Sequence, residues 1–306
     1  MKHLSVLLLA LALILPASQP ACAEKVRLRF VGGPPGGSFE GAARALTQRL
    51  KEELGADVSL AISGGSVENL RRIHKGEADF GIVYAADLFL ARSGQLPYDP
   101  RSYDRILALA PLYPAPAQLM VRADGGITRV GQLAGKRVAI GTIGSGTAAT
   151  AQRFFTSIDL WDLIRPDFTG YQEAISALGH GYIDAIWVFA GLPNQTVVQA
   201  AGSYPVRLLD LSEDAEKKGF FTQYPFFSKT SIAPGTYPGI DYPVNTFQDI
   251  AVWVAGSHVA ADTVRKAMAA AARSQGQSPA LIGDHAGILT PLHPGAELYW
   301  QDMGKR

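Results

Sequence analysis

The pattern of hydrophobic and polar residues at the start of the chain predicts repeated strand–helix units. Apolar residues alternate with arginines over 26–30, which is the two-residue period of a strand. After a Gly/Pro turn, apolar residues recur every three or four positions over 39–54, and Gly55 ends this predicted helix. A strand over 58–62, a helix opening at 66 and a strand over 78–84 follow. This order is typical of an α/β lobe with a mainly parallel sheet.

The second half of the chain repeats the order of the first. It predicts a strand over 137–141, helices over 148–157 and 171–178, and a strand over 183–189. A shift of 105 positions (173 minus 68) superposes residues of the same kind in both halves. The aligned pairs are Glu68 and Glu173, Leu70 and Ile175, Ile73 and Leu178, Gly76 and Gly181, Asp79 and Asp184, and Val83 and Val188. Matches in one register favour two similar lobes.

Two later segments are expected to connect the lobes. The apolar, proline-bearing stretch 107–121 carries the first crossing, and a strand over 246–255 returns to the first lobe before a helix over 258–273. The aromatic tail over 291–300 is expected to pack against the body. The resulting division gives 24–115 plus 250–306 as lobe I and 116–249 as lobe II.

The first 23 residues have the organisation of a signal peptide. Lys2 gives a basic start, an apolar run covers 4–15, and Ala21-Cys22-Ala23 is a small-residue cleavage motif. This run is shorter than the roughly 20 apolar residues needed to cross a bilayer. We therefore expect export to the periplasm, with cleavage between Ala23 and Glu24. The alternative is a lipoprotein acylated at Cys22, and the residues before that cysteine fit poorly.

The composition of the mature chain argues against several classes of protein. Removing the leader takes one basic residue, Lys2, from 28 and leaves 27 basic against 27 acidic residues. This balance argues against a nucleic-acid-binding or polybasic membrane surface. The single cysteine lies in the leader, so the mature protein has no disulfide and depends on a large core. No later apolar segment approaches membrane-spanning length, so we expect a soluble, globular mature protein.

Three predicted helices begin at glycine/serine turns, which suit an anion. The turns are Gly36-Gly37-Ser38, where Ser38 is the expected N-cap, Gly64-Gly65-Ser66, and Gly144-Ser145-Gly146-Thr147. Helix N-termini present unpaired N–H groups and the positive end of the dipole, and glycine permits close approach. Taken singly, each turn is explained better as an ordinary helix cap. Strand ends in α/β lobes line one crevice, so we expect the three turns to converge there.

Aromatic residues at the predicted strand ends are further candidates for pocket walls. Tyr84 ends a strand of the first lobe, and Trp187 and Phe189 end its counterpart in the second. Core packing explains them equally well. Arg122 and Arg153 are the arginines best placed to bind a carboxylate, with a structural or solvated role as the alternative.

Sequence motifs for catalysis and cofactor binding are absent. The chain has no G-x-S-x-G, no mature cysteine and no H-E-x-x-H, and the turn from Gly141 to Thr147 lacks the lysine of a phosphate-binding loop. The histidines after the leader do not have the spacing of metal ligands. We therefore expect no catalytic residue, no metal and no cofactor, although a triad assembled only in space stays open.

A series of short motifs follows a fixed order along nearly all of the mature chain. It comprises the turn into Ser38-Phe39, SGGSVENL over 63–70, GEADFG over 76–81, LYP over 112–114, LAGKRV over 133–138, GSGT over 144–147, PFF over 225–227, PGTYPG over 234–239 and PLHPGAE over 291–297. Together these motifs resemble the TAXI group of solute receptors from tripartite ATP-independent periplasmic (TRAP) transporters.

The resemblance implies an α/β, type II periplasmic-binding-protein fold, in which two lobes close around a ligand at a hinge. It implies a receptor that binds a small organic acid, carboxylate or amino-acid-like, and delivers it to TRAP membrane permease subunits. A periplasmic sensor that feeds a membrane sensor kinase is the alternative. The ligand-binding residues expected from the turns, the strand ends and the resemblance are Gly37, Ser38, Phe39, Gly65, Ser66, Asn69, Tyr84, Ser145, Gly146, Thr147, Phe189 and Gly191.

The chain departs from this family pattern in two places. Phe39 stands where relatives more often have tyrosine, and Ala115 and Gln118 stand where they often have Glu and His. These changes favour a different or more apolar ligand, or a receptor used in signalling. For a site centred on the turns, we expect Ser66→Ala and Ser145→Ala to weaken binding while leaving the fold intact.

Overall fold

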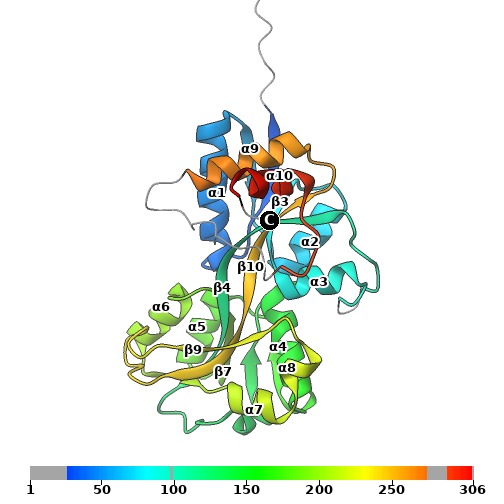
Figure 1. Ribbon diagram of the computed structural model, residues 1–306. Helices are drawn as coiled ribbons and strands as arrows, with labels where there is room; N and C mark the ends of the chain where they lie inside the picture. Colours follow the sequence, from blue (N-terminus) through cyan, green and yellow to red (C-terminus); the bar gives the residue numbers. More distant parts are fainter. Residues whose placement is uncertain (1–25, 97–98, 274–287, 305–306) are drawn as a thin grey trace, which may run out of the picture.

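The computed structural model describes residues 26–96, 99–273 and 288–304, which form two α/β lobes joined by two long strands (Figure 1). The strands are β1 (Arg27–Val31), β2 (Asp57–Ala61), β3 (Phe80–Tyr84), β4 (Ile106–Arg122), β5 (Arg137–Ala139), β6 (Arg165–Asp167), β7 (Ala185–Phe189), β8 (Val206–Leu209), β9 (Ser228–Ile232) and β10 (Val244–Gly256). The helices are α1 (Ser38–Leu54), α2 (Ser66–His74), α3 (Ala85–Arg92), α4 (Gly146–Ser157), α5 (Tyr171–Gly179), α6 (Gln195–Ser203), α7 (Ser212–Lys217), α8 (Phe220–Gln223), α9 (Ala261–Ala272) and α10 (Pro294–Asp302), with short 3-10 turns η1 (Val130–Leu133) and η2 (Trp161–Leu163).

The strands form a continuous hydrogen-bonded series in the order β2-β1-β3-β10-β4-β7-β5-β6, with β8 beside β4 and β9 beside β10. β1, β2 and β3 are parallel to each other, and so are β5, β6 and β7. β10 runs antiparallel to both β3 and β4. Ile106–Pro116 of β4 pairs with β10, and Ala117–Val121 pairs with β7. The first lobe therefore holds β1–β3, α1–α3, α9 and α10, the second holds the elements from β5 to β9, and β4 and β10 belong to both.

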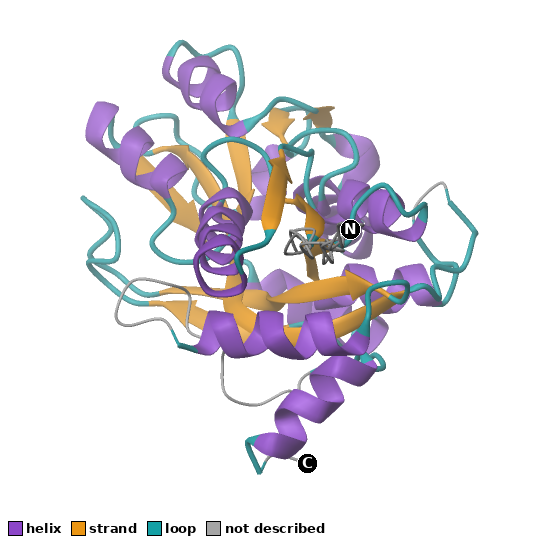
Figure 2. Ribbon diagram, turned by 90° about the horizontal axis from the view of Figure 1, so that it is seen from above, coloured by secondary structure: helices purple, strands orange, loops and turns teal. Residues whose placement is uncertain are grey.

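Burial explains why β4 and β10 are apolar along most of their length. Helices pack on both sides of the strands (Figure 2), so both faces of the central strands lie against other elements. In the first lobe Trp253 is fully buried and packs against Phe80. In the second, the ring of Phe154 stacks on that of Trp187 with centroids 5.4 Å apart. This extensive core needs no disulfide.

The internal repeat is visible in the contacts of two aspartates. The Arg29 backbone N–H donates to Asp79 Oδ2 at 2.7 Å, and the Arg137 backbone N–H donates to Asp184 Oδ2 at 2.8 Å. Each arginine's guanidinium also binds the same carboxylate. Burial raises the pKa of each carboxyl, but the arginine hydrogen bonds outweigh it, and both pKa values lie below the usual range. Asp79 directly precedes β3, and Asp184 directly precedes β7. Both carboxylates therefore stabilise their lobes at the amino ends of these strands, on the sheet edge opposite the carboxyl ends.

Most expected elements are present, with shifted ends. α4 begins at Gly146 rather than 148, and α9 begins at Ala261 rather than 258. α3, α6, α7, α8, α10, β6, β8 and β9 were not expected, because their sequences carry no clear periodicity. The expected leader and its cleavage point lie outside the described residues. Among the described helices, none combines the length and apolar character of a membrane span.

Replacing Asp184 with alanine tests the structural role of the aspartate that the two lobes share. We expect Asp184→Ala to lower the free energy of unfolding by about 1–3 kcal/mol, because the Arg137 N–H loses its acceptor. Urea unfolding measures this loss. Asp124→Ala is the control, since Asp124 pairs with Arg122 at the surface and its loss should change stability little. Equal losses in the two variants would contradict the structural role of Asp184.

Candidate functional site

The three glycine/serine turns lie where the two lobes meet. Each follows a parallel strand: α1 begins after β1, α2 after β2 and α4 after β5. Parallel strands place their carboxyl ends on one edge, so the three helix N-termini come together there. One detail differs from expectation. Ser38 is the first residue of α1, and Gly37 is its N-cap and carries no side chain to cap with.

A cavity of about 20 Å³ lies between these turns. Its volume is close to that of one bound water. Ten of the twelve expected ligand-binding residues line it, and Pro34, Gly64, Tyr171 and Ala190 complete the wall. The ten are Gly37, Ser38, Phe39, Gly65, Ser66, Tyr84, Ser145, Gly146, Thr147 and Phe189. The lining residues include no charged side chain, so hydroxyl groups and backbone N–H groups supply its polarity.

Two expected residues lie elsewhere. Asn69 is fully buried behind the cavity, where its Nδ2 donates to the carbonyls of Gly32 at 2.6 Å and Ile82 at 2.7 Å. The side-chain amide therefore holds the first lobe together and does not face the cavity. Gly191 lines an adjoining groove of about 400 Å³ with Ser38 and Tyr113. In the described part of the chain the buried Tyr113 hydroxyl has no hydrogen-bond partner.

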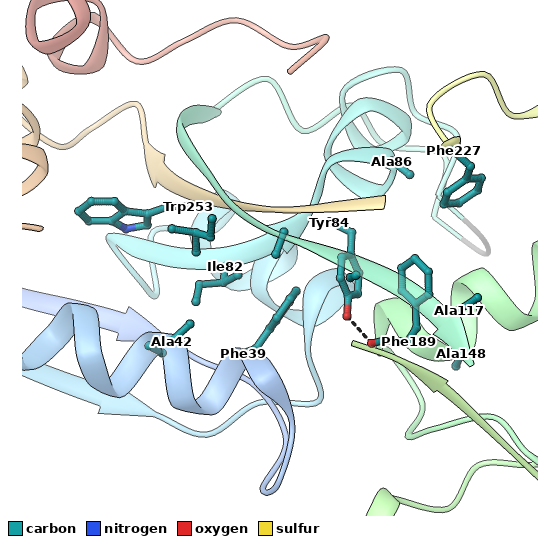
Figure 3. Packing of buried hydrophobic residues seen from close by; sticks show 14 of the residues in the cluster. Phe39, Ala42, Ile82, Tyr84, Ala86, Ala117, Ala148, Phe189, Phe227 and Trp253 are labelled. Carbon is teal, nitrogen blue, oxygen red and sulfur yellow. Dashed lines mark hydrogen bonds between the residues drawn. The ribbon is translucent and has the colours of Figure 1, made fainter. Parts of the chain in front are cut away.

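Direct contacts between the lobes close the cavity. The hydroxyl of Tyr84 donates to the Phe189 carbonyl at 2.5 Å across the gap (Figure 3). The Glu68 N–H in the first turn of α2 donates to the Gly144 carbonyl at 3.0 Å. Thr142 Oγ1 donates to the Gly64 carbonyl at 3.3 Å. Carbonyls of each lobe therefore accept from donors of the other lobe, and the two lobes are in direct contact around the cavity.

The serine hydroxyls of α2 and α4 bond within their own lobes. Ser66 Oγ accepts from the Tyr84 N–H at 2.9 Å, and Ser145 Oγ accepts from the Ala148 N–H at 2.9 Å as an N-cap. Replacing either serine with alanine removes an internal acceptor and costs on the order of 1 kcal/mol of stability. A loss of this size lowers stability without unfolding the protein, so weaker binding with the fold intact stays a prediction for both substitutions.

Tyr171 is a cavity residue that the sequence pattern missed. Its hydroxyl lies 3.0 Å from Thr147 Oγ1 and 3.5 Å from the Phe189 carbonyl. Burial raises the pKa of Tyr171 and, more strongly, that of Tyr84, so both phenols stay protonated at neutral pH. Tyr171 opens α5, where it reads as an ordinary apolar helix position. The signal available was its place in the first turn of a helix after a glycine.

The aromatic residues at the strand ends differ in whether they line the cavity or lie only in the core. Tyr84 and Phe189 line the cavity, and their ring centroids are 4.7 Å apart. Phe39 packs against Tyr84 at 4.7 Å and continues the row in the first lobe (Figure 3). Trp187 is fully buried in the core of the second lobe. Phe39, Tyr84 and Phe189 also belong to the buried core, so they serve both as core and as cavity wall, whereas Trp187 serves only as core.

A buried charged cluster lies beneath the cavity at the junction of the lobes. Arg153 Nη1 of α4 lies 2.8 Å from Asp87 Oδ1 of α3, and both side chains are buried. Asp249 of β10 accepts from the Ala86 N–H at 3.0 Å. Burial raises the pKa of Asp249 to about 7, and the negative charge of Asp87 adds to the rise. Arg153 is thus structural, and Arg122 pairs with Asp124 at the surface.

In the described segments, no three histidine, cysteine, aspartate or glutamate side chains are grouped as ligands for a metal ion. His258 binds Asp79 at 2.9 Å. His293 accepts from the Gly295 N–H at 3.1 Å and so caps α10. These two histidines therefore have structural partners.

Comparison with known proteins agrees with this architecture. The family model described as the NMT1-like family matches residues 32–304. The chain resembles MatC from Rhodopseudomonas palustris, solved with bound malate, at 17% identity, a TM-score of 0.55 and coverage of 91% of this chain and 97% of that one. A periplasmic transporter matches at 17% identity and a TM-score of 0.54, over 93% and 94% of the two chains. The periplasmic binding protein BugD matches at 14% identity and 0.53, over 80% and 81%. The shared feature is the two-lobed α/β fold.

Replacing Gly146 with alanine tests whether the lobes are held in a closed state by the contacts around the cavity. A Cβ at Gly146 would meet Tyr84 Cδ2 at 2.5 Å, Asp87 Oδ2 at 2.6 Å and Ser66 Cβ at 2.7 Å, all in the opposite lobe. We expect Gly146→Ala to hold the lobes apart and raise the radius of gyration in small-angle X-ray scattering. The control is Gly202→Ala in α6, where a Cβ meets nothing within 4 Å. An unchanged radius in Gly146→Ala would refute a closed state set by this contact.

Asp249 predicts a pH dependence of stability. Its pKa is raised from 3.8 to about 7, so the folded state binds more protons between these values, and stability falls as pH rises through them. Asp249→Asn resembles the protonated carboxyl. We expect its stability to match the parent near pH 4 and exceed it increasingly towards pH 8, as measured by urea unfolding. A constant offset between Asp249→Asn and the parent over this pH range would contradict the assignment.

Proposed function

Because the chain belongs to the NMT1-like family and has the two-lobed fold of periplasmic binding proteins, we propose that it is a periplasmic solute receptor for a small organic acid. The observation that carries the proposal is the convergence of three helix N-termini on one cavity between the lobes. Their N–H groups and dipoles favour a carboxylate without a cationic side chain. The malate bound by the structurally similar MatC agrees with this class of ligand.

Binding requires the lobes to open and close again. The cavity of about 20 Å³ has no room for an organic acid, so the ligand enters an open state. It then replaces contacts such as Glu68 N–H to Gly144 C=O and Tyr84 O–H to Phe189 C=O. A ligand held by both lobes favours the closed state by its differential affinity for the two states. The Tyr113 hydroxyl, beside Gly191, is a further donor for a ligand that extends into the adjoining groove.

The lobe division and the cellular role complete the proposal. We place lobe I at 24–115 plus 250–306 and lobe II at 116–249. At these boundaries Asp249 of β10 pairs with Ala115 of β4, so the two strands pass from one lobe to the other side by side. The pattern of the first 23 residues supports export through a cleaved leader, and the TAXI resemblance supports delivery to a TRAP-type permease. Deletion of the gene for this protein tests its role with a permease, because uptake of the organic acid driven by an ion gradient should then be lost. Loss of a transcriptional response to the acid with normal uptake would favour the sensor kinase.

Thermal unfolding against panels of carboxylic acids, their amides, amino acids and sugars tests the ligand class. A ligand at about 100 times its Kd adds roughly 2.7 kcal/mol, which raises the midpoint by roughly 5–10 °C for a chain of this size. We expect the shift with one group of acids and none with their amides. Shifts with sugars alone would overturn the carboxylate class.

Thr147→Val tests the site itself. The valine preserves shape and removes the hydroxyl that bonds to Tyr171 at the α4 N-terminus. We expect the affinity for the acid to fall about tenfold, the equivalent of a hydrogen bond worth about 1.4 kcal/mol. Thr156→Val, near the other end of α4 and exposed, is the matched control. Isothermal titration calorimetry measures both, and equal affinities in the two variants would place the ligand elsewhere.

A further inference from the structure

A second hollow, of about 350 Å³, lies beside the first turn of α4. It shares Ser145 with the candidate cavity, but its walls continue along α4 through Ala148 and Ala149, whereas those of the cavity run through Gly146 and Thr147. Val67 and Arg71 of α2 form its first-lobe wall. The hollow is therefore distinct from the cavity and is also built by both lobes. We call it the Arg71 pocket.

The walls of the Arg71 pocket are largely apolar. Trp161 and Phe168 face it from the second lobe, and Ile143 forms its rim. Ile143 is 77% exposed and Phe168 is 46% exposed, in a protein whose other phenylalanines are mostly buried. Large apolar side chains that gather around one hollow are typical of a ligand site. The volume falls within the range of about 300–1,000 Å³ common for small-molecule sites.

Arg71 is the single charged residue in the described wall of this pocket. Its Nε lies 3.5 Å from Asp99 Oδ2, a longer contact than the 2.8 Å that Arg101 makes with each oxygen of Asp99. Tyr103 donates to the same carboxylate at 2.5 Å. Asp99 is thus held mainly by Arg101 and Tyr103. Arg71 Nη1 lies 4.0 Å from the position of a Cβ at Gly144, which directs it towards the pocket.

We propose that the Arg71 pocket is a second ligand site, for a small apolar monocarboxylate such as an aryl- or alkyl-substituted acetate. The carboxylate pairs with the Arg71 guanidinium, and the apolar body packs against Val67, Trp161 and Phe168. One cation matches one carboxylate, and the apolar wall disfavours a second. Because α2 and α4 lie in different lobes, the occupant bridges them and stabilises the closed state.

Trp161 provides a local signal for the test, because the other three tryptophans are buried, Trp187 and Trp253 fully and Trp300 at 4% exposure. The mature protein is titrated with phenylacetate and with phenylacetamide, its uncharged counterpart. We expect a saturable change in fluorescence with the acid, lost in Trp161→Phe while calorimetry still detects binding. The amide should bind at least tenfold more weakly. Equal binding of acid and amide, or no saturation at millimolar concentrations, would overturn the proposal.

Arg71→Met removes the charge and keeps an apolar side chain of similar length. We expect it to abolish the preference for the acid, whereas Arg72→Met, the next residue of α2 and outside the pocket, should retain it. Retained preference in Arg71→Met would refute the role of Arg71. Thr147→Val separates the two sites: it should leave phenylacetate binding unchanged, and a loss in this variant would instead place phenylacetate in the cavity.

Discussion

The antiparallel pairing of β4 with β10 is the constraint on which the other features depend. Both strands run through both lobes, and their register brings Ala115 opposite Asp249 at the junction. Paired strands resist separation along their length but bend and twist, so they suit a hinge. The same strands fix which edges of the two parallel sheets face each other. The glycine turns meet at one cavity because β4 and β10 hold those edges together.

Closure places the protein's own carbonyls at donors suited to a ligand. The Gly144 carbonyl accepts from the first turn of α2, and the Phe189 carbonyl accepts from Tyr84. Such contacts stabilise a closed state without ligand only modestly, because each replaces a hydrogen bond to water. Gly146 allows the close approach, since its Cα faces Tyr84, Asp87 and Ser66. In the proposed receptor, closure and ligand recognition use the same surfaces, which links affinity to the hinge.

The residues that line the cavity carry no charge, but charged side chains lie beneath it. The Asp87–Arg153 pair is buried between the lobes, and Asp249 shares its surroundings. A buried ion pair adds little net stability but penalises arrangements that separate its partners in a dry environment. The cluster therefore favours one relative position of the lobes. Asp79 and Asp184 each act within one lobe. Asp79 binds Arg29 and so fixes β3 to β1, and Asp184 binds Arg137 and so fixes β7 to β5.

Local pattern predicted the α/β units, their repeat and the strands that join the lobes, because periodicity and glycine turns act over a few neighbouring residues. The ten residues of the cavity wall were expected from the turns and strand ends together with the TAXI resemblance. Short elements such as α3 and β8 carry too little pattern to be predicted. Tertiary structure alone decided that Asn69 bonds to Gly32 and Ile82, that Trp187 is core, and that Tyr171 faces the cavity. It also decided that Arg153 neutralises Asp87. Which groups meet across the lobes depends on how β4 and β10 pair over more than a hundred intervening residues, and no local pattern encodes that distance.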